Sequence, residues 1–367
     1  MAANEGNAEL LAQIRRDVSE VFSVDSVVWG KSANEPAFRL LGRFTVPTQM
    51  AYSTLAPKFR ALGLTVLFRK EQGDQQSIWV LRGTTPSLVS TGRLNLILLI
   101  LTLLSTLFVG TMMVSQDLMD FVRRPWLGLP FAVSLMAILG AHELGHYFAA
   151  RRYDVPVTLP YFIPMPLGPF GTLGAFISMK APPPNRRALL TIAAAGPLAG
   201  LVLAVPILLL GLSLSPITQL VPGDGIGMEG NSLLYALLKI VSFGRFLPAG
   251  GEDVLLHPIA FAGWAGLLVT GLNLIPVGQL DGGHILYALF GERSRQMIWP
   301  VVVLLIGLGF IWTGWFLWVV LIVVFGRHYA APLDDLTRLS SRQRLVGWLA
   351  IAVFLIVFTP LPLTVVY

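Results

Sequence analysis

The chain has 367 residues, of which 54% are hydrophobic and only 13% charged, and its mean hydropathy is +0.71. A soluble domain carries about 25% charged residues, so this composition excludes an ordinary soluble fold and predicts a protein of the lipid bilayer. The 26 Lys and Arg against 20 Asp and Glu indicate basic loops beside anionic lipid and no nucleic-acid partner, and the lack of cysteine excludes disulfides and thiolate metal sites.

Residues 1–92 are the most polar part of the chain and predict a small N-terminal α+β domain ahead of a membrane-embedded domain over residues 93–367. Nothing in this part suggests a catalytic cluster, so we expect a cytosolic domain that binds a regulator. Direct presentation of a substrate is the alternative. The first residues lack a signal-peptide pattern, which favours a cytosolic N-terminus. The spacing of apolar residues predicts helices over 8–21 and 48–62 and strands over 26–30, 36–45, 64–70 and 77–82.

Two apolar segments follow, over residues 94–114 and 127–150, and each is long enough to cross a bilayer core of about 30 Å. The second ends in Arg151 and Arg152, and further basic residues lie in the next loop. Basic residues flanking a span remain on the cytoplasmic side, so this end of the segment is expected near the cytoplasm. The protein is therefore predicted to be an integral multi-pass membrane protein.

Residues 155–184 are rich in Pro and Gly yet apolar, and residues 171–179 alternate as a strand does. We expect a membrane-associated β-hairpin here. Its free edge could hold an unwound substrate peptide as an added strand, with Gly171, Gly174 and Phe176 as binding residues. The alternative is a hairpin that only fills space in the fold, and the sequence leaves both readings open.

Further apolar segments cover residues 187–212, 257–276 and 345–360, and residues 299–325 predict two short helices folded into a hairpin. The fold class is therefore an α-helical polytopic membrane protein with about six to seven transmembrane helices. Within the first of these segments, small residues recur at Gly196 and Gly200, a spacing that lets helices pack closely.

The chemistry is concentrated in an H-E-x-x-H pattern within the second apolar segment. His142 and His146 share one face of a helix and could hold one Zn²⁺, and Glu143 is placed to act as a general base. A catalytic zinc needs a third ligand, and Asp281 is the best candidate because a proline precedes it and glycines follow it. His284 is the second candidate. Ionisable groups this deep in an apolar helix are costly, which favours a functional role.

Asn273 lies about two helical turns before Asp281, and its amide could donate to a developing oxyanion or grip a substrate backbone. It could equally cap a broken helix. A membrane metal transporter or sensor that uses the same ligands is the alternative to an enzyme, but it gives no reason for Glu143. A catalytically inactive relative would need a lost ligand or base, and none is missing.

The chain resembles the site-2 protease family of intramembrane zinc metallopeptidases, in its bacterial and plastid-type branch. The motifs that carry the resemblance are His142-Glu143-Leu-Gly-His146, Gly196-Pro197-Leu-Ala-Gly200 and the segment 273–282, Asn-Leu-Ile-Pro-Val-Gly-Gln-Leu-Asp-Gly. The resemblance covers about residues 94–325. It implies a zinc metalloendopeptidase that cleaves a transmembrane protein or peptide substrate within the lipid bilayer. It assigns the zinc ligands to His142, His146 and Asp281 and the base to Glu143. The PDZ-like insert of many relatives is missing.

Overall fold

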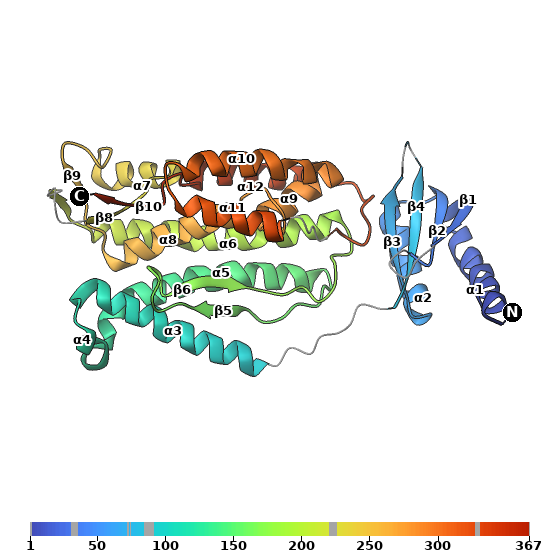
Figure 1. The fold of residues 1–367 in the computed structure, drawn as a ribbon, viewed down its shortest axis with the longest axis horizontal. Coiled ribbons are helices and arrows are strands. Elements are labelled where there is room, and N and C mark those ends of the chain that lie inside the picture. The colour runs from blue at the N-terminus through green and yellow to red at the C-terminus, as the bar shows by residue number, and fades with distance from the viewer. Residues whose placement is uncertain are drawn as a thin grey trace. The chain divides into compact units, whose positions relative to one another are not determined.

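The computed structural model describes residues 2–30, 36–71, 73, 75–83, 92–219, 226–326 and 331–366. The chain divides into two compact units, and most helices and strands of both are labelled in Figure 1. The first unit comprises Met1–Leu88, Lys180–Leu189 and Ala330–Ser340. The second comprises Val89–Met179, Leu190–Tyr329 and Ser341–Tyr367.

The first unit is built on a four-stranded antiparallel sheet with the strand order β1-β2-β4-β3. Alternate residues of β3, such as Leu64 and Val66, are buried together with Ile14, Leu55 and Phe59 of the two helices. This period of two in the strands and of about four in the helices gives the unit its own hydrophobic core. The elements are α1 (Ala2–Ser19), β1 (Phe22–Trp29), β2 (Phe38–Phe44), α2 (Thr48–Ala61), β3 (Leu64–Lys70) and β4 (Gln76–Arg82).

The outer edge of β3 pairs with a segment from much later in the chain, and that segment pairs in turn with a second one. Phe68 donates its N–H to the carbonyl of Leu333 at 2.9 Å and accepts from the N–H of Asp335 at 3.2 Å. The N–H of Leu333 in turn donates to the carbonyl of Pro183 at 2.9 Å. An exposed strand edge invites non-specific pairing, and here the protein's own loops cover it. The first unit is therefore assembled from three separated stretches of sequence.

The second unit is mainly helical. Its helices are α3 (Gly92–Ser115), α4 (Leu118–Arg123), α5 (Leu129–Arg152), α6 (Arg186–Ser213, which begins in the first unit), α7 (Leu233–Phe243), α8 (Pro258–Asn273), α9 (Asp281–Phe290), α10 (Ile298–Gly309), α11 (Gly314–Phe325) and α12 (Ser341–Val357), with 3₁₀ turns η1 (Pro125–Gly128) and η2 (Gly291–Met297). Its short strands are β5 (Tyr161–Pro164), β6 (Thr172–Phe176), β7 (Ile217–Gln219), β8 (Ile226–Glu229), β9 (Glu252–Val254) and β10 (Leu363–Val366).

Three helical segments of the described chain are long and apolar enough to cross a membrane, judged by length and composition: Gly92–Ser115, Pro125–Arg152 and Arg186–Ser213. Shorter apolar helices add to them, and α10 packs against α11 as a helical pair. This arrangement is that of a helical membrane protein. The larger number of spans expected from the sequence stays a prediction, because α7, α8 and α11 are shorter than a full crossing.

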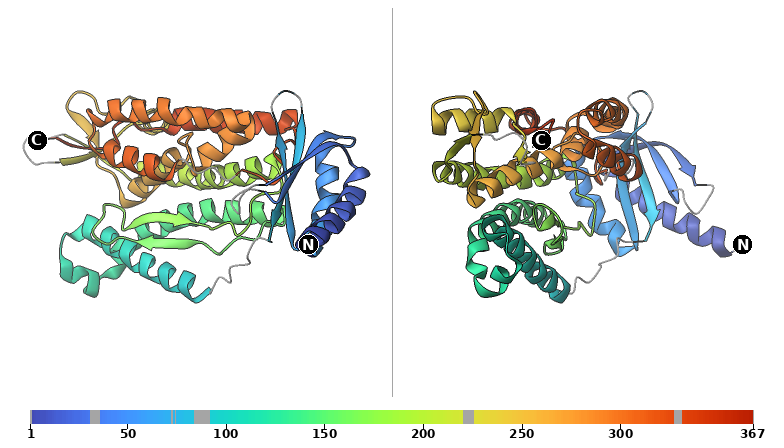
Figure 2. Two further views of the ribbon diagram at one scale, coloured as in Figure 1. Left: turned by 45° about the vertical axis from the view of Figure 1, so that its right-hand side comes forward. Right: turned by 60° about the vertical axis from the view of Figure 1, so that its left-hand side comes forward.

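Strands β5 and β6 pair in antiparallel fashion and lie against α3 and α5 (Figures 1 and 2). The turn before β6 is held to α3, because the Ser105 hydroxyl donates to the carbonyl of Gly171 at 2.6 Å. Gly171 has a φ of +69°, and a Cβ there would come within 2.7 Å of the Ser105 carbonyl oxygen. Glycine is required at this turn for both reasons. The hairpin is therefore anchored to the helices that surround it.

Candidate metal centre

Two buried imidazoles one helical turn apart on α5 form the first half of the centre. The Nε2 atoms of His142 and His146 are 3.1 Å apart, and both residues are almost fully buried. The Nδ1 of His146 lies 2.8 Å from the carbonyl oxygen of Ile192 on α6. A carbonyl only accepts, so Nδ1 carries the proton and Nε2 keeps its lone pair. This is how proteins fix a histidine for metal binding.

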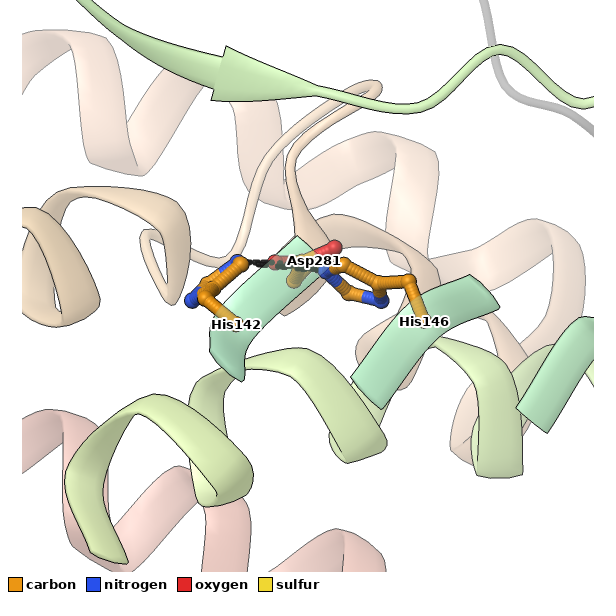
Figure 3. Close-up of side chains that lie close together, drawn as sticks. All are labelled: His142, His146 and Asp281. Carbon is orange, nitrogen blue, oxygen red and sulfur yellow. Dashed lines mark hydrogen bonds and ion pairs between the residues drawn. The ribbon is translucent and has the colours of Figure 1, made fainter. Parts of the chain in front are cut away.

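Asp281 completes the group from a different helix. Its Oδ2 lies 3.3 Å from Nε2 of His142 and 3.2 Å from Nε2 of His146. The three side chains point toward one another in Figure 3, and their potential ligand atoms lie within 4.8 Å of one another. We call these three residues the candidate metal centre. Two imidazoles and a carboxylate match the three-ligand set of catalytic zinc sites, so the group could bind one metal ion.

The turn between α8 and α9 brings Asp281 to this position. Gly278 has a φ of +61°, which favours glycine. Gly282 packs directly against the carbonyl of Leu274, and a Cβ on Gly283 would lie 2.5 Å from the carbonyl carbon of Val277. Larger residues would push α9 away from the turn. The glycines beside Asp281 therefore let the chain reverse tightly and begin a helix at the aspartate.

Glycines on α6 make room for the two histidine rings. A Cβ on Gly196 would occupy the space of the His146 ring nitrogen, and a Cβ on Gly200 would lie 3.3 Å from the Cβ of His142. The four-residue spacing of these glycines matches that of the histidines. The sequence indicated close helix packing at Gly196 and Gly200 but not that the packing partners are these rings. The equal spacing of the two motifs was the available signal.

Glu143 and Asn273 lie beside the centre without belonging to the ligand group. Glu143 is 4% exposed, and its carboxylate accepts a hydrogen bond from the backbone at Ile177, just after β6. The Asn273 Nδ2 lies 3.4 Å from Nε2 of His142. An acidic group and an amide are thus held next to the place where an ion would bind. They are available for proton transfer and for hydrogen bonding to a bound molecule.

His284, the second candidate for the third ligand, lies outside the ligand group. It is on α9 one turn after Asp281 and is 8% exposed. Its Nε2 is buried and has no hydrogen-bond partner among the described residues. Of the two candidates, the structure brings Asp281 and not His284 to the pair of imidazoles.

The three hairpin residues predicted to bind substrate have different surroundings. Gly171 packs against the backbone of α3, so it is not accessible to a substrate. Gly174 has a φ of +102° with open space at its Cβ position, and Phe176 is 48% exposed, its ring stacked on Tyr161 at 5.3 Å. Within the described part of the chain, β6 pairs with β5 alone. Gly174 and Phe176 are therefore accessible, whereas Gly171 serves the fold.

The fold and the centre together define a helical membrane protein with a His-His-Asp group enclosed by its helices. The family model described as "Peptidase family M50" matches residues 130–313, which is half of the chain and includes the whole centre. The chain belongs to this family, the site-2 proteases, as the resemblance in its motifs implied.

The curated relatives are named as probable zinc metalloproteases. The chain is 33% identical over 244 residues to "Probable zinc metalloprotease EGY2, chloroplastic" of Arabidopsis thaliana, covering 64% of this chain and 42% of the relative. It is 35% identical over 242 residues to "Probable zinc metalloprotease EGY1, chloroplastic" of the same plant, with coverages of 64% and 43%. The chain thus spans less than half the length of these relatives. No solved structure matches it.

Proposed function

We propose that this protein is an intramembrane zinc metalloendopeptidase that hydrolyses a peptide bond in or near a transmembrane segment of a membrane-protein substrate. The observation that carries the proposal is the candidate metal centre with Glu143 beside it, buried in a chain of the M50 family. The names of the relatives, which are zinc metalloproteases, agree with it.

In this proposal His142, His146 and Asp281 would hold one zinc ion per chain. When bound, zinc would act as a Lewis acid, which lowers the pKa of a water molecule to about 7 and polarises the carbonyl group of the substrate. Glu143 takes the proton from the attacking water and returns it to the leaving amine. The Asn273 amide, placed 3.4 Å from His142, donates a hydrogen bond to the substrate carbonyl oxygen.

The substrate would lie extended along β6. A peptide bond within a helix is shielded by the helix itself, so a substrate must unwind before water can attack it. The free edge of β6 offers backbone hydrogen bonds to such a strand, next to Gly174 and Phe176. The backbone at Ile177 links the end of this strand to Glu143, which supports placing the scissile bond there.

The centre would lie near the cytoplasmic side of the membrane, with the N-terminus in the cytosol. Arg151 and Arg152 at the end of α5 support this orientation. Residues 1–92 would form a regulatory domain, because its β3 edge pairs with the segment that leads into α12, and that segment pairs in turn with the one that leads into α6. A regulator that binds this domain could thus influence the ends of both helices.

The test is cleavage of a membrane-spanning model substrate by the purified, zinc-loaded chain in liposomes. We expect Glu143→Gln to retain zinc but to abolish cleavage, because the ligands remain and the base is lost. Glu292→Gln, at an exposed acidic residue of η2, is the matched control and should cleave as the wild type does. Retained cleavage by Glu143→Gln, or zinc flux across the liposome membrane, would instead favour the metal transporter or sensor.

A further inference from the structure

An apolar groove of about 470 Å³ lies between α9, η2 and α12. Its walls include Ile285 and Phe290 of α9 and Trp348 and Ile351 of α12. Apart from Arg293 and Ser294, the lining residues are apolar. Ligand pockets of about 300–1,000 Å³ with apolar walls and a few polar groups at one end are typical of small-molecule sites.

The polar end of the groove carries positive charge. Arg293 is exposed and has no acidic partner among the described residues, because the nearby Glu292 already pairs with Arg295 at 2.7 Å. On α12, Arg344 precedes Trp348 by one turn and lies on the same helical stripe as Trp348 and Ile351. It too is exposed and without an acidic partner in the part of the chain that the structure describes.

The two helices run in opposite directions, which places both arginines at the same end. Near the end of α9, the Phe290 ring meets Trp348 edge-on at 5.8 Å, and Leu289 contacts Gly347. Trp348 lies in the first half of α12, so the start of α12 adjoins the end of α9 and the beginning of η2. The groove thus has a cationic mouth here and an apolar interior toward Gly282.

We propose that this groove binds one anionic glycerophospholipid. One of its two acyl chains would lie in the groove between α9 and α12, and its phosphate would lie between Arg293 and Arg344. A guanidinium binds a phosphate through two parallel hydrogen bonds, and basic sites between membrane helices bind anionic head groups. A helical peptide fits poorly, because one turn of a helix about 10 Å wide already fills roughly 420 Å³. A single thin chain with a charged end matches both the volume and the charge.

The groove also adjoins the candidate metal centre. Its inner wall includes Pro276 and Gly282, which flank Asp281 on the turn that positions this carboxylate. A lipid in the groove would support that turn from behind. On the proposed function, a bound lipid should therefore raise the fraction of zinc that the chain retains. Lipid binding itself needs no metal and is measured separately.

The test uses the full chain purified in detergent, with lipid retention measured by native mass spectrometry. We expect phosphatidylglycerol to be retained in preference to phosphatidylcholine. Each of Arg293→Gln and Arg344→Gln should weaken this retention about fivefold. Arg342→Gln, on another face of α12, is the matched control and should bind as the wild type does. Equal retention of both lipids, or arginine variants that bind as the wild type, would overturn the proposal.

A second variant tests the interior of the groove independently of charge. Ile351→Trp should fill the groove and reduce phosphatidylglycerol retention at least tenfold. A photoreactive amino acid at Ile351 in liposomes that contain phosphatidylglycerol should crosslink to lipid. Crosslinking to a peptide instead would show a protein-docking groove and overturn the proposal, as would full lipid retention by Ile351→Trp.

Discussion

The second unit contains two clusters of buried polar side chains, and the two clusters differ in whether a cationic side chain lies beside the buried carboxylates. In the candidate metal centre, two imidazoles and a carboxylate converge without a cationic side chain. In the other cluster, the ammonium group of Lys239 lies at 0% exposure, 3.3 Å from Asp253 and 3.9 Å from Glu229. Tyr235 donates to Glu229 at 2.7 Å and offers its ring to the same ammonium at 4.7 Å. We call these four residues the Lys239 cluster.

The difference shows how to recognise a metal site in a structure that contains no ions. The Lys239 cluster carries its own cation, so its carboxylates are paired within the protein. The candidate metal centre gathers ring nitrogens and a carboxylate oxygen that face one another, and in the described chain the polar donor near them is the neutral amide of Asn273. Buried acceptors of this kind need a cation or a proton. The Lys239 cluster therefore needs no ion from outside the chain, whereas the candidate metal centre has the composition of a cation-binding group.

The largest expected effect is a difference in zinc content between a variant of the candidate metal centre and a variant of the Lys239 cluster. Asp281→Ala should lose stoichiometric zinc, because Asp281 is the carboxylate that lies beside the two imidazoles. Asp253→Ala, at a buried aspartate of the Lys239 cluster, should retain zinc whenever the variant folds. Metal analysis of both purified proteins is the measurement. Full zinc in Asp281→Ala together with its loss in His284→Ala would assign the third ligand to His284.

Removal of the buried cation should give the next largest effect, on stability. Lys239→Ala leaves two buried carboxylates without their partner, and breaking a buried ion pair costs about 3–5 kcal/mol. We expect a markedly lower unfolding temperature in detergent with unchanged zinc stoichiometry in the folded fraction. Arg245→Ala breaks the exposed pair with Glu252 and should cost about 1 kcal/mol or less. Equal unfolding temperatures for the two variants would contradict this reading.

A smaller effect is expected where α6 packs against the histidines. Gly196→Ala places a methyl group in the space of the His146 ring and should cost about 1–3 kcal/mol of stability, with weaker zinc retention. Gly200→Ala meets His142 at 3.3 Å, a contact that a slight shift relieves, so its effect should be smaller. Zinc titration of the two variants checks the order. If Gly200→Ala weakened zinc binding more than Gly196→Ala, the packing of α6 against the His142 and His146 rings would not control zinc binding.

The smallest effect is a pH dependence in the Lys239 cluster. Burial raises the pKa of the Glu229 carboxyl above its ordinary value of 4.5, against the opposing hydrogen bond from Tyr235. The folded protein then holds the proton to higher pH than the unfolded chain, so this contribution to stability falls as pH rises above about 4.5. Glu229→Gln should flatten that dependence with little change in stability at acidic pH. Unfolding temperatures measured across pH check it, and an unchanged slope would contradict it.

Local sequence patterns were sufficient for much of the fold. The alternation over residues 64–70 predicts the strand that the structure has as β3, with the same bounds. The glycines within residues 299–325 indicated a break, and α10 and α11 flank it. In both places the signal is the period of apolar residues, which depends only on neighbours in the chain. The sequence missed the strands β7 to β10, because they are three or four residues long and carry no such period.

The sequence by itself was sufficient to identify the family and to predict a candidate metal site. The spacing of His142, Glu143 and His146 follows from helix geometry, and the proline and glycines around Asp281 indicated a turn that could return a carboxylate. Only the tertiary structure decided that Asp281 and not His284 joins the imidazoles, that glycines of α6 face those rings, and that later loops cover the edge of β3. These are contacts between distant segments, and a local period holds no information about which segments meet.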